Sequence, residues 1–554
     1  MIRSVCARRC LPLVLLGCLT APVAAQDGAG VEDFSPGDDP AQRLRDLERE
    51  RERLEEREPR DDPVIEIPDL LLPDLEDEEV EFFLEAVRFS PSEFLEDDWL
   101  EELAAEYVGR IVSFGDLNAM IERINDAYAE EGLVTARAFV PPQEIRDGEV
   151  RVLLVEGRLG EVLIEGAEHT DEAYIRGRIP LTEGEVLRVP TLQASLQDFN
   201  RREAVRAGAA LQAGDDFGES DVVLQIQEPP RLAYQVFADN AGSRNTGENR
   251  VGGFVSWFSP FGRADRLTAF LVGSSGSTAA DINYSTPIGH GGAKLETRFA
   301  ANEIEIVRGP LRDLSVEGDS VRASTRYVHP LARGVRRTWD AIGGLAYVRS
   351  RTELDGFRFA DSEVQTVRAG LRFRDYAPPG LFGYFLEVEQ HVGHSRFRDQ
   401  AGELNETDSA LMWTGNLLWE QRLSDTSYTV LRGDWQYTGD PEAVLSPELY
   451  QIGGAFDVRG YPQGVSAGEK GYFASGEIRY SGVDVAEPFA FIDHGGVRQL
   501  DQDNESLTSI GLGGFRRFGG GVSGSLTIGY PLTDIVADQD RYQIHLRLAW
   551  QGNW

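Results

Sequence analysis

Close to the C-terminus, the stretch YQIHLRLAW (residues 542–550) places an apolar side chain at every second position. Successive side chains of a β-strand face opposite sides of the sheet, so one face of this strand is apolar and aromatic. The opposite face carries Gln543, His545 and Arg547. A single strand of this kind suits either a soluble sheet with its apolar face inward or a membrane sheet with its apolar face toward lipid.

The same two-residue period continues from about residue 231 to the last residue, Trp554. Helical periodicity is absent from this region, turn residues separate the segments, and the polar faces are rich in arginine. A soluble sandwich of this length would be divided into domains, yet no linker is visible. We therefore predict a mainly β fold with a transmembrane antiparallel barrel of about 16 strands over residues 230–554. Other segments with this alternation are AKLETRF (293–299), VRASTRY (321–327), VRAGLRFR (367–374) and YFASGEIRY (472–480).

Residues 1–25 have the organisation of a signal peptide for export. Three arginines precede a short apolar stretch (residues 11–20), and the small residues VAA suit cleavage before Gln26. The apolar stretch is shorter than the ~20 residues of a membrane-spanning helix. A lipoprotein cleavage site at LLGC, ending at Cys18, is the open alternative. All 3 cysteines lie in this segment, so the mature chain has no disulfide.

Three segments follow the signal peptide. Residues 26–39 are rich in Gly, Asp and Pro and are expected to be flexible. Residues 40–60 alternate acids and arginines at spacings that favour a helix. This helix has few apolar side chains, so it is either solvated or enclosed in a polar cavity, which would make it a possible plug of the barrel. Residues 61–80 form an acidic linker interrupted by prolines.

Between the linker and the barrel, two units repeat the order β-α-α-β-β, over residues 81–157 and 158–229. The clearest helix is expected from Ser113 to Glu131, with apolar residues on one stripe and Gly132 as its stop. Ser113 and Asp116 resemble a capping box, with Asp in place of Glu or Gln. These residues predict two small tandem α/β domains.

Several functions are disfavoured by composition and motifs. The formal net charge of −38 would repel nucleic acid. Residues 464–468 match G-x-S-x-G, but glycines precede the motif and a strand pattern follows it, so Ser466 lacks the context of a nucleophile. The 7 histidines show no H-E-x-x-H spacing. We therefore expect no enzyme activity, no cofactor and no metal site.

The order of these parts resembles the outer-membrane transporters of two-partner secretion, the haemolysin and filamentous-haemagglutinin secretion type. Their periplasmic repeats are POTRA domains. The resemblance covers nearly the whole mature chain. It rests on these motifs: LQDFN (196–200), LQAGDDFGESDVVLQIQEPP (211–230), DNAGSRNTGENR (239–250), YSTPIG (284–289), IGGAFDVRGYPQG (452–464) and FAFIDHGGV (489–497).

The resemblance implies a lumenal site made of two motifs. The first is the tetrad Val458, Arg459, Gly460 and Tyr461, at the tip of an extracellular loop folded back into the barrel. The second is an F-x-D-x-G wall motif, formed here by Phe491, Asp493 and Gly495. Physical chemistry agrees, because a guanidinium inside a barrel needs an anionic partner, and a planar pair with a carboxylate suits arginine better than lysine.

The resemblance also implies a function. The expected protein is a bacterial outer-membrane pore that exports a large partner exoprotein from the periplasm to the cell surface without nucleotide hydrolysis. Its POTRA domains would bind the N-terminal secretion domain of the partner. Other expected partners are outer-membrane lipid and, during biogenesis, the barrel-assembly machinery and periplasmic chaperones. The alternatives are an insertase for outer-membrane proteins, a passive porin-type channel and, more remotely, a soluble adhesive β-sandwich.

Overall fold

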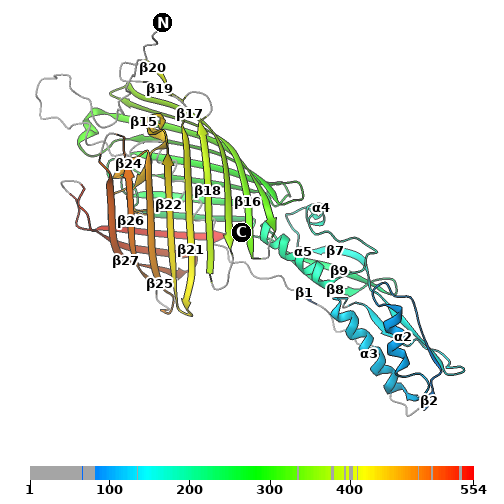
Figure 1. Ribbon diagram of the computed structural model, residues 1–554. Coiled ribbons are helices and arrows are strands. Elements are labelled where there is room, and N and C mark those ends of the chain that lie inside the picture. The colour runs from blue at the N-terminus through cyan, green and yellow to red at the C-terminus, as the bar shows by residue number, and fades with distance from the viewer. Residues whose placement is uncertain are drawn as a thin grey trace, which may run out of the picture. The chain divides into compact units, whose positions relative to one another are not determined.

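We describe the protein from a computed structural model (Figure 1). It describes residues 65–66, 81–133, 135–333, 336–375, 380–391, 395–398, 403–407, 410–483, 486–500, 503–535 and 539–554. The expected signal peptide, flexible segment and charged helix lie outside the described residues, as does the linker apart from Ile65–Glu66. The chain divides into two compact units, Pro59–Pro229 with Gly262–Ala264, and the region from Pro230 onward.

The first α/β domain contains a three-stranded sheet of order β3-β6-β5 and a separate pair, β2 with β4. Helix α3 begins after Ser113, whose hydroxyl accepts the Asp116 N–H, while the Asp116 carboxylate accepts the Ser113 N–H. The capping box predicted from the sequence is therefore confirmed. The apolar stripe of α3, including Leu117, Ile124 and Tyr128, is buried against the sheet. The elements are β2 (Glu81–Phe83), β3 (Ala86–Phe89), α2 (Asp97–Ala105), β4 (Ile111–Ser113), α3 (Phe114–Glu130), β5 (Arg137–Phe139) and β6 (Glu149–Val155).

The second α/β domain has a four-stranded sheet of order β1-β8-β9-β7. Its edge strand β1 is Ile65–Glu66, which lies within the predicted linker and pairs in parallel with Ala209–Ala210 of β8. This strand was not predicted, because two residues are too few to show a side-chain period. An edge strand presents unpaired N–H and C=O groups, which explains why β8 accepts it. The other elements are β7 (Arg158–Glu165), α4 (Glu172–Arg176), α5 (Val189–Arg202), β8 (Arg206–Ala213) and β9 (Glu219–Gln227).

The second unit is a closed antiparallel barrel in which β10 pairs with β29. Sixteen strands form the wall, since β18 pairs directly with β21 and the hairpin β19–β20 extends from β17. The fold-class prediction is thus confirmed. The first half of the wall is β10 (Leu232–Asp239), β11 (Arg250–Phe258), β12 (Arg266–Gly273), β13 (Ser277–Ile288), β14 (Ala293–Glu305), β15 (Val316–Arg333), β16 (Arg337–Leu354) and β17 (Phe357–Asp375). The second half is β18 (Gly380–His391), β21 (Leu411–Ser424), β22 (Ser427–Thr438), β25 (Lys470–Tyr480), β26 (Glu487–Arg498), β27 (Glu505–Gly519), β28 (Val522–Pro531) and β29 (Gln543–Asn553), and the hairpin is β19 (Ser395–Arg398) with β20 (Leu404–Thr407).

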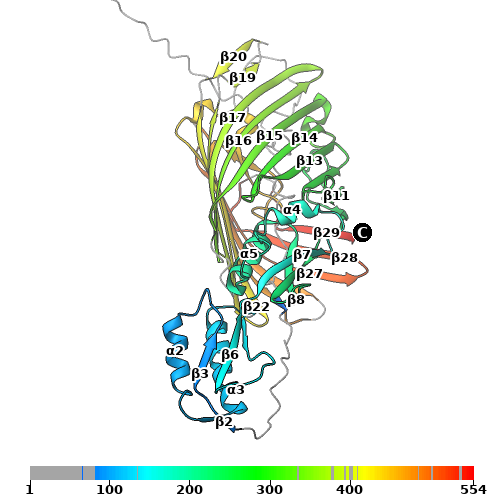
Figure 2. The same ribbon diagram turned by 90° about the vertical axis from the view of Figure 1, so that its right-hand side faces the viewer.

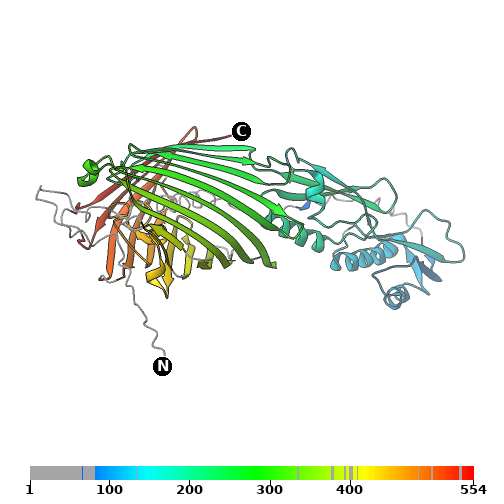
Figure 3. The ribbon, with the colours of Figure 1, turned by 90° about the horizontal axis from the view of Figure 1, so that it is seen from above.

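The two faces of the wall differ in chemistry. Large apolar side chains such as Phe299, Leu345 and Leu512 are 52–68% exposed on the outer face. Charged side chains such as Arg298 and Glu477 are buried on the inner face. In a soluble sheet the apolar face is buried and the charged face is exposed to water. The reverse arrangement found here is typical of a transmembrane barrel with a polar lumen. Strands β13–β17 lie side by side in one part of the wall (Figures 2 and 3). No helix in the described part of the chain is long and apolar enough to cross a membrane, a finding that does not bear on strands.

Candidate functional site in the barrel lumen

The tetrad Val458–Tyr461 lies in the loop that joins β22 to β25. Two short strands, β23 (Tyr450–Ile452) and β24 (Ser466–Gly468), pair and form the stem of this loop. Gly453 and Gly454 follow β23 with φ of 104° and 115°, backbone angles that residues other than glycine rarely adopt. The glycines therefore let the chain leave the stem and carry the tetrad to the wall. The loop also contains the 3-10 turns η4 (Pro441–Ala443) and η5 (Ser446–Glu448).

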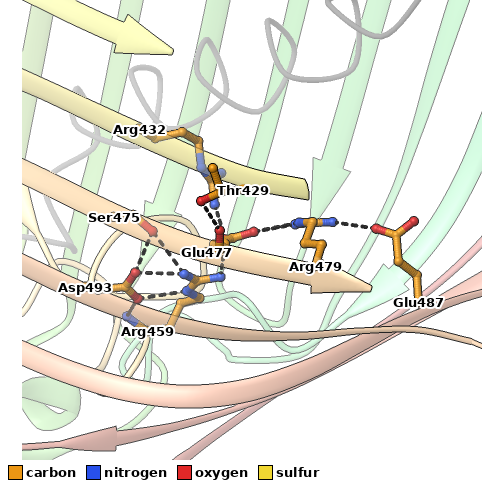
Figure 4. Close-up of polar contacts among 8 residues, drawn as sticks. All are labelled: Thr429, Arg432, Arg459, Ser475, Glu477, Arg479, Glu487 and Asp493. Carbon is orange, nitrogen blue, oxygen red and sulfur yellow. Dashed lines mark hydrogen bonds and ion pairs between the residues drawn. The ribbon is translucent and has the colours of Figure 1, made fainter. Parts of the chain in front are cut away.

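Arg459 forms a two-pronged ion pair with Asp493 of β26 (Figure 4). Its Nε lies 2.8 Å from Oδ2, and one terminal nitrogen lies 2.7 Å from Oδ1. The backbone N–H of Arg459 also donates to Oδ2, at 3.1 Å. Both side chains are buried, at 7% and 0% exposure. The structure thus brings together the two charged residues that the sequence had paired by resemblance.

Glu477 of β25 is a second anionic partner of Arg459, and the sequence reasoning did not single it out. Its Oε1 lies 2.7 Å from a terminal nitrogen of Arg459 and also accepts from Arg432. Its Oε2 accepts from Arg479, whose other terminal nitrogen reaches Glu487 at 3.2 Å. Three arginines and three carboxylates therefore form one network, in which Glu477 contacts all three arginines (Figure 4), and each buried charge has a partner of opposite sign.

Ser475 of β25 adds a hydroxyl that contacts both members of the Arg459–Asp493 pair. Its hydroxyl donates to Asp493 Oδ1 at 2.7 Å and accepts from a terminal nitrogen of Arg459 at 3.1 Å. The guanidinium therefore uses all three of its nitrogens. Burial by itself lowers the pKa of Arg459, but the hydrogen bond and charge of Asp493, followed by the charge of Glu477, hold that pKa above its usual range. Arg459 is consequently a fixed positive charge at any physiological pH.

The aromatic residue of the wall motif supplies a flat surface for the cation. The guanidinium carbon of Arg459 lies 3.6 Å from the centre of the Phe491 ring. Phe491 is 5% exposed and faces the lumen, so the contact is desolvated. Arginine stacks on such a ring better than lysine does, which adds a second reason for arginine at this position.

Two glycines allow the loop and the wall to approach closely. A Cβ atom on Gly460 would lie 2.6 Å from the Ser509 Cβ, and one on Gly495 would lie 3.1 Å from a methyl carbon of Val458. Val458 is fully buried in a small apolar cluster with residues of β23, β25 and β26. Val458 therefore packs closely against Gly495, where a side chain would leave too little room.

Tyr461 anchors the far side of the tetrad. Its ring is buried in the same apolar cluster as Val458. Its hydroxyl lies 3.0 Å from the carbonyl oxygen of Thr508 and 2.9 Å from that of Thr533, and accepts the Thr533 N–H at 3.1 Å. The tyrosine thus combines packing with a polar tip, as expected from its chemistry.

The backbone of Arg459 is held from the opposite side by β28 and β29. The carbonyl oxygen of Arg459 accepts a hydrogen bond from Nε2 of His545, at 2.9 Å. A Cβ atom on Gly529 would lie 2.4 Å from this carbonyl oxygen. The alternation of the last strand had placed His545 on the polar face, but no sequence signal pointed to its partner.

The site has no arrangement suited to covalent catalysis. Ser466 lies in the short strand β24 and donates to Glu505, whereas a nucleophile elbow requires a strand-to-helix turn and a histidine. Within the described residues, no three His, Cys, Asp or Glu side chains are grouped to hold a metal ion. What the geometry can do is fix one loop to one part of the lumen wall.

Comparisons with known proteins identify the family of the chain. Residues 218–515 match the family model "Haemolysin secretion/activation protein ShlB/FhaC/HecB", and residues 82–157 match the ShlB-type POTRA domain. The heme/hemopexin transporter protein HuxB of Haemophilus influenzae is 22% identical over 81% of this chain and 83% of its own length. The outer membrane transporter CdiB of Escherichia coli O6:K15:H31 is 23% identical over 81% of this chain and 78% of its own.

A solved structure shows the same fold. CdiB from Escherichia coli superimposes with a TM-score of 0.60 and 21% identity, covering 94% of this chain and 99% of that one. Members of the matched family are secretion channels of the outer membrane, with POTRA domains in the periplasm, and are not enzymes. The chain therefore belongs to the ShlB/FhaC/HecB family of haemolysin secretion/activation proteins and is an outer-membrane transporter of a secreted partner protein.

Proposed function

We propose that this transporter threads one large exoprotein through its barrel without nucleotide hydrolysis, and that the paired tetrad and wall motifs keep the lumen in its working arrangement. The observation that supports this most directly is the attachment of Arg459 to both Asp493 and Glu477. A loop fixed by buried ion pairs stays in one place while a chain passes beside it. Folding of the partner outside the cell would supply the directionality.

In this proposal, the second α/β domain binds the partner protein. Its strand β8 already accepts Ile65–Glu66 as a short parallel strand added at the edge of the sheet. An extended segment of a partner could add to a sheet edge in the same way, with main-chain hydrogen bonds giving affinity. On the same sheet a cavity of about 390 Å³ is lined by Val162, Ile179, Leu181 and Leu224, with Arg176 and Glu183 at polar positions. Such a cavity could bind an apolar side chain of the added segment.

Other parts of the proposal concern the state of the pore and its assembly. The charged helix over residues 40–60, which lies outside the described residues, remains a predicted plug of the resting barrel. Insertion of the barrel itself would use the barrel-assembly machinery and periplasmic chaperones. An exported haemolysin or adhesin is the expected class of partner.

Reconstitution tests the proposal and separates it from its rivals. The purified transporter would be inserted in vesicles, and the unfolded product of a neighbouring exoprotein gene would be added without nucleotide. We expect the partner to enter the vesicles and become protected from protease. A pore that admits small solutes but no partner would instead support a passive porin, and insertion of a second barrel protein into the vesicle membrane would support an insertase.

A further inference from the structure

Two neighbouring cations on the outer face of the barrel have no role in the lumenal site. Lys470 begins β25 and Arg498 ends β26, and the two are directly paired across these strands, which lie side by side in the wall (Figure 1). Alternate positions of the same strands, Tyr472 and Ile492, are exposed on the outer face at 45% and 54%. Since side chains alternate along a strand, Lys470 and Arg498 also point outward.

The pair lies at the extracellular end of the barrel. β10 begins at Leu232, directly after the periplasmic domains, and Ala233 pairs with Asn553 near the end of β29. That end of the barrel is therefore periplasmic. Because neighbouring strands run in opposite directions, β25 begins and β26 ends at the other end.

Aromatic residues place the pair at the level of the lipid headgroups. Trp413 of β21 is paired with Tyr437 of β22, and both are exposed on the outer face. The ammonium of Lys470 lies 4.9 Å from the centre of the Tyr437 ring. Outward-facing Trp and Tyr side chains of barrels mark the boundary between hydrocarbon and headgroups. Trp413, Tyr437, Lys470 and Arg498 thus form one row across four strands, aromatic at one end and cationic at the other.

The two positive charges of this row stand directly opposite each other on paired strands. Like charges directly opposite each other on paired strands repel. Elsewhere on the outer face an arginine has carboxylate neighbours, as Arg349 has at 3.5 Å from both Asp361 and Glu363. Neither Lys470 nor Arg498 forms an ion pair within the described residues. Glu469, next to Lys470, is buried in the loop and accepts the Leu500 N–H at 2.9 Å.

We infer that Lys470 and Arg498 bind the phosphate groups of lipid A, the anionic lipid of the outer leaflet. Arginine presents parallel N–H groups to a phosphate, and lysine supplies a compact second charge. The acyl chains would lie against the apolar outer face below, at Tyr472 and Ile492. β25 and β26 also carry Glu477 and Asp493, so the bound lipid would hold the two strands on which the lumenal site is built.

Lipid-dependent stability measures this binding. The full chain would be reconstituted in phosphatidylcholine vesicles, with or without bisphosphorylated lipid A, and its heat-induced mobility shift and bound lipid A would be measured. We expect lipid A to raise the shift temperature of the native protein and dephosphorylated lipid A to leave it unchanged. The K470Q/R498Q variant should bind lipid A about twenty-five-fold more weakly, because each basic residue near an anionic surface contributes roughly a factor of five.

Matched variants and a competing anion show which interaction produces the stabilisation by lipid A. Arg516 is also an exposed arginine of the outer face, but it lies at the periplasmic end of β27, beside Phe518 at 5.0 Å. R516Q should keep the full lipid A effect, and the charge-conserving K470R/R498K variant should keep most of it. Equal binding of lipid A by K470Q/R498Q would overturn the inference. Inorganic phosphate that reproduces the stabilisation would show a simple anion site and would overturn the assignment to lipid A.

Discussion

The guanidinium of Arg459 pairs with Asp493, whose two oxygens accept from two of its nitrogens at 2.8 and 2.7 Å, and its carbon lies 3.6 Å from the centre of the Phe491 ring. Arg459 belongs to a loop, whereas its partners belong to a wall strand. This contact therefore joins the loop to the wall, together with the contacts of Glu477, Tyr461 and His545. Removal of one partner of a buried ion pair typically costs about 3–5 kcal/mol, so the loop position should be sensitive to single substitutions.

Glu477 should be as important as the wall motif itself. Its carboxylate forms ion pairs with Arg432, Arg459 and Arg479. E477Q would remove the negative charge that these three guanidiniums share. We expect the loop to be released, with faster protease cleavage inside residues 439–469 and a loss of secretion of roughly ten-fold or more.

Glu487 provides the matched control for this substitution. It lies at the edge of the network, where it contacts Arg479 and Tyr428 and is 26% exposed. E487Q should secrete nearly normally. Equal effects of E487Q and E477Q would show that total charge matters and that the central position does not.

A methyl group on Gly529 should push the loop away from the wall. The added carbon would lie 2.4 Å from the Arg459 carbonyl oxygen, and backbone atoms cannot move aside as a flexible side chain can. G529A should therefore reduce secretion strongly while the barrel still inserts. Gly514, where an added Cβ would meet nothing within 4 Å, is the control, and G514A should be silent. Normal secretion by G529A would mean that the loop is not held at this point.

The capping box of α3 predicts a pH dependence in the first POTRA domain. The hydrogen bonds from the Ser113 N–H and hydroxyl lower the pKa of Asp116 below its usual 3.8. A lowered folded-state pKa means that this stabilisation is complete above about pH 4 and is lost as the pH falls through the folded value. D116N should lower the stability of α3 by less than about 1 kcal/mol, since the group is exposed. Hydrogen exchange of α3 in the full chain would measure this, and an unchanged exchange rate in D116N would contradict the role of the cap.

Deletion of residues 40–58 tests the predicted plug. Removal of a helix from the lumen should enlarge the free cross-section of the pore. We expect higher single-channel conductance in planar bilayers, with the heat-modifiable barrel unchanged. Conductance equal to that of the full chain would show that these residues do not fill the pore.

Alternation along the strands predicted the barrel, because a side-chain period of two fixes which face each residue occupies. It correctly placed Ser475, Glu477 and His545 on a polar face, where they contact Arg459. Alternation could not show which polar residues meet, since that depends on strand register and on a loop that crosses the lumen. The pairing of Arg459 with Asp493 came only from resemblance. The strand Ile65–Glu66 was missed because its pairing is set by the edge of β8 and not by its own sequence.

We expect export to require the attachment of Arg459 to the wall. The direct measurement is the amount of partner protein released by cells that carry R459A, with the barrel verified as inserted and heat-modifiable. Release should be abolished in R459A, and R459K should restore little of it because lysine can neither pair with both oxygens of Asp493 nor stack as arginine does on Phe491. Normal release by R459A with an intact barrel would show that export does not depend on this attachment.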